Sequence, residues 1–164
     1  PECTLSAIRR AIEVGAHVVE IDVRTSKDGV LFLLHDSTLD RTTYGTGPAN
    51  ERTMAELKEL DAGGWFNEIY RGERIPTLGE ALEACRGKID VLLDLKETGE
   101  TYAKAVADDV RTHGDPARTI FGVRSVDCGT RSQLRREAPT EWNCRDSAGG
   151  AAAAQIPSRC TAGR

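Results

Sequence analysis

Two carboxylates, Glu20 and Asp22, stand two positions apart within the otherwise apolar run at residues 18–23. In an extended strand alternate side chains point to the same face, so these carboxylates project together, away from the apolar side chains beside them. Two neighbouring anions on a buried strand repel each other and lose hydration unless a cation neutralises them. Carboxylate oxygens are the preferred ligands of hard divalent cations. The pair therefore predicts a metal site, with a solvated strand face as the alternative.

Other polar side chains end two later apolar runs. His35 and Asp36 follow a leucine-rich run, and Asp94 and Lys96 share one face of a strand expected over residues 89–96. Histidine exchanges protons near neutral pH, which suits it to general acid or base catalysis. The alternatives are a hydrogen-bonded histidine at a strand end and a simple ion pair. We expect these groups near the carboxyl ends of their strands, where parallel α/β folds assemble active sites.

Alternating helices and strands position these side chains. The apolar patterns predict helices over residues 3–14, 54–60, 77–86, 99–113 and 127–138, and strands over residues 17–23, 30–35, 89–96 and 118–124. Thr77 with Glu80 predicts a capping box at a helix start. The polar, turn-rich residues 36–74 predict a small, weakly structured insertion. The repetition indicates an α/β fold with a parallel sheet, either open or part of a (β/α)8 barrel.

Composition also bears on which classes of protein the chain can belong to. The 164 residues carry 26 acidic and 22 basic side chains, and this net charge of −4 argues against nucleic-acid binding through a broad basic surface. No apolar run is long enough for a transmembrane helix, and the five cysteines lack zinc-site spacing. Cytoplasmic and exported locations both stay open, because the sequence starts at Pro1 rather than at methionine. Residues 1–138 read as the folded domain, and residues 139–164 as a disordered or aberrant tail.

The order of the motifs resembles the glycerophosphodiester phosphodiesterase family. Residues 1–4, Pro-Glu-Cys-Thr, resemble the Pro-Glu-Asn-Thr that opens the first helix of that family, and residues 20–22 match its Glu-x-Asp. Residues 25–43 match its Asp-Gly turn and the His-Asp-x-x-Leu-x-Arg-Thr-Thr motif that follows. The resemblance continues in order through residues 45–47, 75–78 and 93–96, and an ordered set of this length is far more specific than an isolated His-Asp.

The resemblance implies a partial TIM (β/α)8 barrel of the phosphodiesterase type. It also implies hydrolysis of glycerophosphodiesters, small-molecule substrates, to an alcohol and glycerol 3-phosphate in lipid metabolism. Glu20, Asp22 and Asp94 would bind one divalent cation, Ca²⁺ or Mg²⁺. The family usually has glutamate where this chain has Asp94, so affinity or metal preference is expected to shift.

The same resemblance assigns roles to three further residues. His35 would be the general acid that protonates the leaving alkoxide, and Lys96 would offset the charge of the phosphodiester in the transition state. Glu2 would contact the metal or the glycerol. The other catalytic histidine of the family belongs to a His-Arg-Gly motif upstream of Pro1. The alternative function is therefore a truncated, non-catalytic copy that binds a divalent metal or phosphate without turnover.

Overall fold

The computed structural model describes residues 1–123 and the backbone of residues 144–146. Its helices are α1 (Leu5–Glu13), α2 (Met54–Lys58), α3 (Leu78–Cys85) and α4 (Glu100–His113), and its strands are β1 (Val18–Thr25), β2 (Leu31–Leu33), β3 (Asp90–Leu95), β4 (Thr119–Val123) and β5 (Cys144–Asp146). Each predicted element within residues 1–123 is present, with ends shifted by a few residues. The helix predicted over residues 127–138 lies outside the described residues. No described helix is long and apolar enough to cross a membrane.

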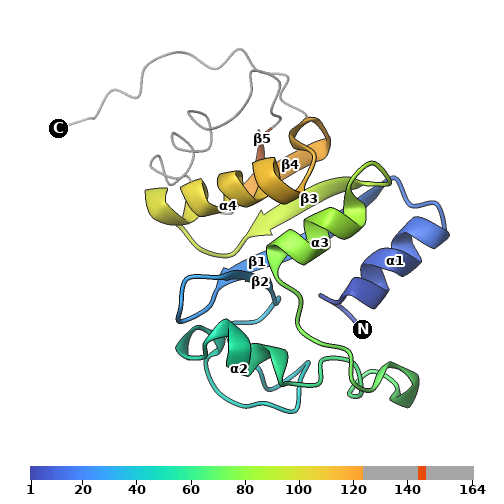
Figure 1. Cartoon of the computed structure of the whole chain (residues 1–164), viewed down its shortest axis with the longest axis vertical. Helices are drawn as coiled ribbons and strands as arrows, with labels where there is room; N and C mark the ends of the chain where they lie inside the picture. The colour runs from blue at the N-terminus through green and yellow to red at the C-terminus, as the bar shows by residue number, and fades with distance from the viewer. Residues whose placement is uncertain (124–143, 147–164) are drawn as a thin grey trace.

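One sheet with strand order β2-β1-β3-β4-β5 forms the centre of the molecule. The pairs β1–β3, β3–β4 and β4–β5 are parallel, and β1–β2 is antiparallel. Helices α1, α3 and α4 lie along one face of the sheet, while α2 and the insertion gather at one end (Figure 1). This is the α/β architecture of part of a barrel, as the sequence predicted. The predicted capping box at the start of α3, between Thr77 and Glu80, is also present.

Strand β2 departs from the parallel pattern because the chain reverses in a tight turn after β1. The Ser26 amide donates to the Val30 carbonyl at 2.9 Å, and Gly29 adopts the positive φ of +82° that the turn requires. So short a connection allows only antiparallel pairing, since a parallel crossover needs a dozen or more residues. As a result the chain runs back along β1, where the Leu34 amide donates to the Asp22 carbonyl at 3.3 Å.

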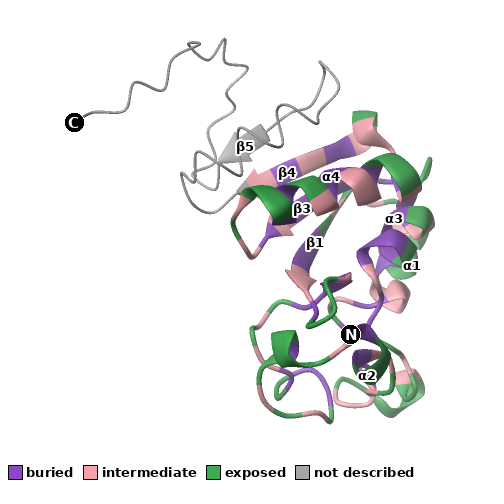
Figure 2. Cartoon of the chain, turned by 60° about the vertical axis from the view of Figure 1, so that its left-hand side comes forward, coloured by how far each residue is buried: buried purple, intermediate pink, exposed green. Residues whose placement is uncertain are grey.

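Buried residues, purple in Figure 2, lie on the central strands and on the helices packed against them, and most of them are apolar. Alternate residues of β3, among them Leu93 and Leu95, are buried on the helix side. The Tyr102 hydroxyl ties α4 to β1 by donating to the Val23 carbonyl at 2.8 Å. Burying an aliphatic side chain such as Leu93 or Leu95 contributes about 1.5–3 kcal/mol to folding. The polar side chains of the same strands are consequently left on the other face.

The insertion at residues 36–74 was expected to be weakly structured, but it packs around a small core of its own. Buried apolar residues from β2, the insertion and the positions that flank it form that core, namely Phe32, Leu34, Leu39, Ala49, Met54, Leu57, Ala62 and Ile75. A capping box between Thr53 and Glu56 starts its short helix α2. Long-range packing, rather than local propensity, therefore gives this polar segment its structure.

Strand β5 lies within residues 139–164, the range predicted to be a disordered or aberrant tail. Its backbone pairs with β4 in parallel, with Phe121 opposite Cys144. The polar sequence gave no strand pattern there, but backbone pairing at a sheet edge does not depend on side-chain hydrophobicity. The rest of that range lies outside the described residues.

The segment before α1 contains a backbone conformation that is uncommon for its residue type. Among the described residues, Cys3 is the one non-glycine residue with a positive φ, +53°. The next residue, Thr4, caps α1 by accepting from the Ala7 amide at 3.3 Å, and its hydroxyl donates to the Pro1 carbonyl at 2.7 Å. The helix cap therefore holds Cys3 in the left-handed region, where asparagine is better tolerated than most residues.

Replacing Cys3 with asparagine should stabilise the chain. Relief of the left-handed strain is expected to raise the free energy of unfolding by about 1 kcal/mol. Urea denaturation without divalent cations measures the change. Cys3→Val is the matched control, because a β-branched residue tolerates this conformation worst and should lower stability. Equal stability of the asparagine and valine variants would contradict the prediction.

Candidate functional site

Strand register brings the predicted carboxylates together. In the parallel pairing of β1 with β3, Asp22 lies directly opposite Asp94. Glu20 lies two residues before Asp22 on the same strand, opposite Leu92. Alternation places all three carboxylates on the sheet face that the helices do not cover. One oxygen from each of Glu20, Asp22 and Asp94 lies within 4.8 Å of the others. These residues form what we call the acidic cluster.

Lys96 lies between two members of the acidic cluster. Its Nζ is 2.6 Å from Asp22 Oδ1 and 2.7 Å from Asp94 Oδ2. The Lys96 and Asp22 side chains are only 3% and 8% exposed, so water screens this interaction weakly. Three carboxylates and one ammonium group leave a formal charge of −2. That charge matches a divalent cation.

The pKa shifts of Glu20 and Lys96 show that the acidic cluster carries an excess of negative charge. Burial raises the pKa of Glu20, and the charges of Asp22 and Asp94 raise it further, against the opposing effects of Lys96 and His35. Ionisation of Glu20 is thus disfavoured when its surroundings hold no added cation. Burial opposes the charged form of Lys96, but its hydrogen bonds to the two aspartates prevail, and the pKa of Lys96 is raised.

The surroundings of Asp22 fit a hard cation. Asp22 Oδ2 accepts from the Cys3 thiol at 3.4 Å, a weak hydrogen bond. Asp22 Oδ1 is buried, and its contact within residues 1–123 and 144–146 is the ammonium of Lys96 at 2.6 Å. A buried carboxylate oxygen with so little hydrogen bonding, beside two other carboxylates, suits an oxygen-binding divalent cation.

His35 follows β2 and is held by its backbone and by its ring. Arg24 of β1 donates to the carbonyls of Leu34 and His35, at 3.1 and 2.7 Å, and so fixes the backbone. The ring Nδ1 lies 2.7 Å from Asp36 Oδ1. Because β2 is antiparallel, His35 approaches the cluster from beside β1 instead of from the end of a parallel strand. Its charge still lowers the pKa of Glu20.

Glu2, predicted to contact the metal or the substrate, lies outside the acidic cluster and pairs with Arg41. Arg41 Nη2 and Nη1 donate to Glu2 Oε1 and Oε2 at 2.5 and 2.9 Å. The same guanidinium donates to Asp36, and its hydrogen bonds, followed by that of His35, lower the pKa of Asp36. The sequence predicted no role for Arg41 or Arg24. Arg41 belongs to the His-Asp-x-x-Leu-x-Arg-Thr-Thr motif, so its place in that motif could have indicated a role beside His35. Arg24 belongs to no motif that could have indicated its role.

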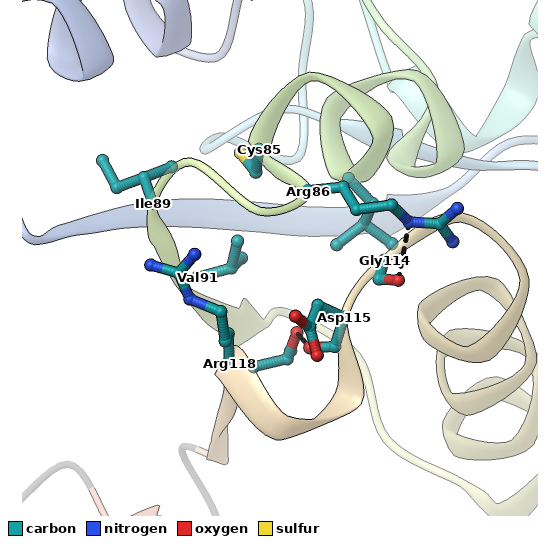
Figure 3. Close-up of a pocket in the computed structure, with 9 residues that line it drawn as sticks. Cys85, Arg86, Ile89, Val91, Gly114, Asp115 and Arg118 are labelled. Atoms are coloured by element: carbon teal, nitrogen blue, oxygen red, sulfur yellow. Dashed lines mark hydrogen bonds between the residues drawn. The ribbon is translucent and has the colours of Figure 1, made fainter.

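A small hollow at the opposite end of the strands is structural. It measures about 10 Å³, space for about one water molecule. Figure 3 shows Arg86 reaching across to Gly114, and its guanidinium donates to the Gly114 and Thr112 carbonyls at 2.9 and 2.7 Å. These bonds satisfy carbonyls at the end of α4. The hollow is lined by residues at the start of β3 and β4, away from the acidic cluster, and it is not a candidate site.

Comparison with known proteins places these features in one family. The sequence profile of the glycerophosphoryl diester phosphodiesterase family matches residues 1–139. A glycerophosphodiester phosphodiesterase of Caldanaerobacter subterraneus is 48% identical over 96 residues, which are 58% of this chain and 39% of that protein. Mouse glycerophosphodiester phosphodiesterase 1 is 41% identical over 109 residues, which are 65% of this chain and 33% of that protein.

Solved structures agree with the sequence comparison. A glycerophosphodiester phosphodiesterase from Agrobacterium tumefaciens superimposes with a TM-score of 0.77 at 40% identity, covering 88% of this chain and 60% of that one. An Oleispira antarctica phosphodiesterase, solved with the product sn-glycerol-3-phosphate, gives 0.80 at 32% identity, covering 89% and 59%. The chain thus spans little more than half of these structures and a smaller share of the curated relatives. Its profile match, its fold and its relatives show that it belongs to the glycerophosphoryl diester phosphodiesterase family.

Proposed function

We propose that this chain provides a cation site and a proton donor for the hydrolysis of glycerophosphodiesters to an alcohol and glycerol 3-phosphate. The observation that carries the proposal is the acidic cluster, with Lys96 between two of its carboxylates and His35 nearby, in a member of this family. Support for the substrate class comes from the Oleispira antarctica relative, whose structure contains sn-glycerol-3-phosphate.

The acidic cluster would hold one Ca²⁺ or Mg²⁺. When bound, such a cation supplies positive charge that polarises phosphoryl oxygens. The formal charge of −2 on the cluster and Lys96 supports this occupancy. Asp94 is one methylene shorter than the glutamate usual in the family. A shorter ligand leaves more space on its side of the cluster, which favours the larger and geometrically more tolerant Ca²⁺ over Mg²⁺.

Lys96 would contribute charge to the phosphodiester. In the absence of a cation its ammonium is occupied by Asp22 and Asp94. From this position the ammonium would donate to the phosphodiester oxygens of a substrate bound beside the acidic cluster. Preorganised positive charge of this kind stabilises the transition state of phosphoryl transfer.

His35 would act as the general acid. Its Nδ1 faces Asp36, which leaves Nε2 as the ring nitrogen available to a substrate. Nε2 would give its proton to the departing alcohol oxygen as the phosphorus–oxygen bond breaks. Asp36 would hold the orientation of the ring before and after the transfer. Contact of Glu2 with the metal or the glycerol stays a prediction, and in this structure both Glu2 oxygens accept from Arg41.

A second candidate function is binding of a divalent cation or phosphate without turnover. The acidic cluster favours it because cation binding needs only Glu20, Asp22 and Asp94, whereas turnover also needs complete acid–base chemistry. Cation binding with no hydrolysis would assign this second function. Both together would support the first.

Glu20→Gln should stabilise the cation-free chain and weaken the stabilisation that a divalent cation gives. Glu20 has a raised pKa in the folded chain, so its contribution is favourable below the ordinary value of 4.5 and is lost as pH rises through the raised value. The cation-free variant should therefore melt higher than the parent at neutral pH, and this advantage should fade below pH 4.5. A cation at 100 times its dissociation constant should stabilise the parent by about 2.7 kcal/mol and the variant far less.

Thermal melts with Ca²⁺, Mg²⁺ or a chelator measure both effects. Asp108→Asn is the control, because Asp108 pairs with Lys104 and Arg111 on exposed α4. It should leave the cation response unchanged. A full response retained in Glu20→Gln would remove Glu20 from the site.

His35→Ala should abolish most hydrolysis. Losing a general acid typically lowers the rate by about 10²–10⁴-fold. Release of glycerol 3-phosphate from glycerophosphocholine, followed with a coupled dehydrogenase, measures turnover. His17→Gln is the control, since His17 is exposed, precedes β1 and lies outside the acidic cluster. This variant should retain the parent rate. Unchanged turnover in His35→Ala would refute the assigned role.

A further inference from the structure

We infer that Arg41 is a positioning residue, which bridges Asp36 and Glu2 and thereby fixes the His35 imidazole with its proton on Nδ1 and with Nε2 available for proton transfer. The catalytic consequence rests on the proposed function. The tautomer of His35 does not, because it can be measured without turnover.

The guanidinium of Arg41 makes four hydrogen bonds to two carboxylates. Nε donates to Asp36 Oδ2 at 2.6 Å, and Nη2 donates to Asp36 Oδ1 at 3.2 Å. Nη2 and Nη1 donate to Glu2 Oε1 and Oε2 at 2.5 and 2.9 Å. A planar guanidinium with paired donors matches two carboxylates, whereas the single ammonium of lysine does not. The bridge therefore fixes the plane of the Asp36 carboxylate.

The orientation of Asp36 in turn determines the state of His35. Asp36 Oδ1, one of the two oxygens held by Arg41, is the atom that lies 2.7 Å from His35 Nδ1. An ionised carboxylate only accepts hydrogen bonds, so the facing Nδ1 must carry a proton. In the neutral ring Nε2 is then the unprotonated nitrogen, and in the imidazolium it carries the transferable proton.

The far end of the bridge is anchored beside the acidic cluster. Glu2 precedes Cys3, whose thiol contacts Asp22 Oδ2, and Thr4, which caps α1. Arg41 therefore joins the loop that follows His35 to a segment that touches the cluster, although 39 positions separate Arg41 from Glu2. This link fixes the proton donor relative to the carboxylates.

Stability alone is a poor explanation for this bridge. The side chains of Arg41, Glu2 and Asp36 are 46%, 41% and 31% exposed, and exposed ion pairs typically contribute only about 0–1 kcal/mol. The backbone of His35 is held separately by Arg24. Loss of the Arg41 bridge should therefore release the ring of His35 while leaving its backbone in place.

The test uses nitrogen-15 NMR of the histidine rings in the whole chain, which contains three histidines. The His35 signals are assigned by their loss in His35→Gln. In the parent we expect protonation of neutral His35 at Nδ1, and in Arg41→Gln a shift of the population toward Nε2 protonation. Arg41→Lys should give an intermediate population. The parent tautomer retained in a folded Arg41→Gln variant would overturn the inference.

Two controls make the result specific. Arg71→Gln removes an arginine of similar exposure that pairs with Glu68 in the insertion, and it should leave the His35 signals unchanged. His113, which pairs with Glu83, serves as an internal reference. If Arg41→Gln does not fold, Glu2→Gln removes the far anchor instead. A shift in that variant supports the bridge, and an unchanged His35 tautomer overturns it.

Kinetics separate this inference from the proposed function. With glycerophosphocholine as substrate, Arg41→Gln should lower kcat about tenfold or more with little change in KM, because a misplaced proton donor affects the chemical step. Arg41→Lys should recover part of the loss. A parent chain without turnover would count against the proposed function alone, since the tautomer measurement would still decide the role of Arg41.

Discussion

The parallel register of β1 and β3 sets Asp22 directly opposite Asp94, and the charge balance of the acidic cluster follows from the repulsion between those two carboxylates. Their separation is fixed by backbone hydrogen bonds, so the side chains cannot move far apart to relieve it. Lys96 lies between them and offsets part of the charge, yet Glu20 adds a third anion at the same face. Apolar packing on the other face of these strands helps to offset the repulsion.

That packed face explains how the fold tolerates the repulsion between the carboxylates of the acidic cluster. Helices α1, α3 and α4 bury the alternate apolar residues of the central strands, and this burial stabilises the fold independently of the polar face. Each strand thus carries two kinds of side chain with separate tasks. Replacing Glu20 by a neutral residue should accordingly favour folding while weakening cation binding, the usual opposition between stability and function at a preorganised site.

Sequence alone predicted the alternation of helices and strands and the shared face of Glu20 and Asp22, because both depend on local periodicity. The opposition of Asp22 and Asp94 was not derivable from periodicity, since register is set by the whole sheet. The antiparallel course of β2 depended on turn geometry. The pairing of Glu2 with Arg41 joins residues 39 positions apart, so no local pattern contained it. The strand at residues 144–146 carries no apolar pattern, so periodicity could not indicate its pairing with β4.

The two halves of the site differ in how water acts on them. Asp22 and Lys96 are almost fully buried on rigid strands, so added salt screens their interaction little. The chain from His35 through Asp36 and Arg41 to Glu2 is partly exposed, and mobile ions compete with each of its contacts. Its geometry survives because four hydrogen bonds converge on one planar group. Removing the guanidinium removes all four bonds at once and frees the Asp36 carboxylate, so the orientation that Asp36 gives the His35 ring depends on Arg41.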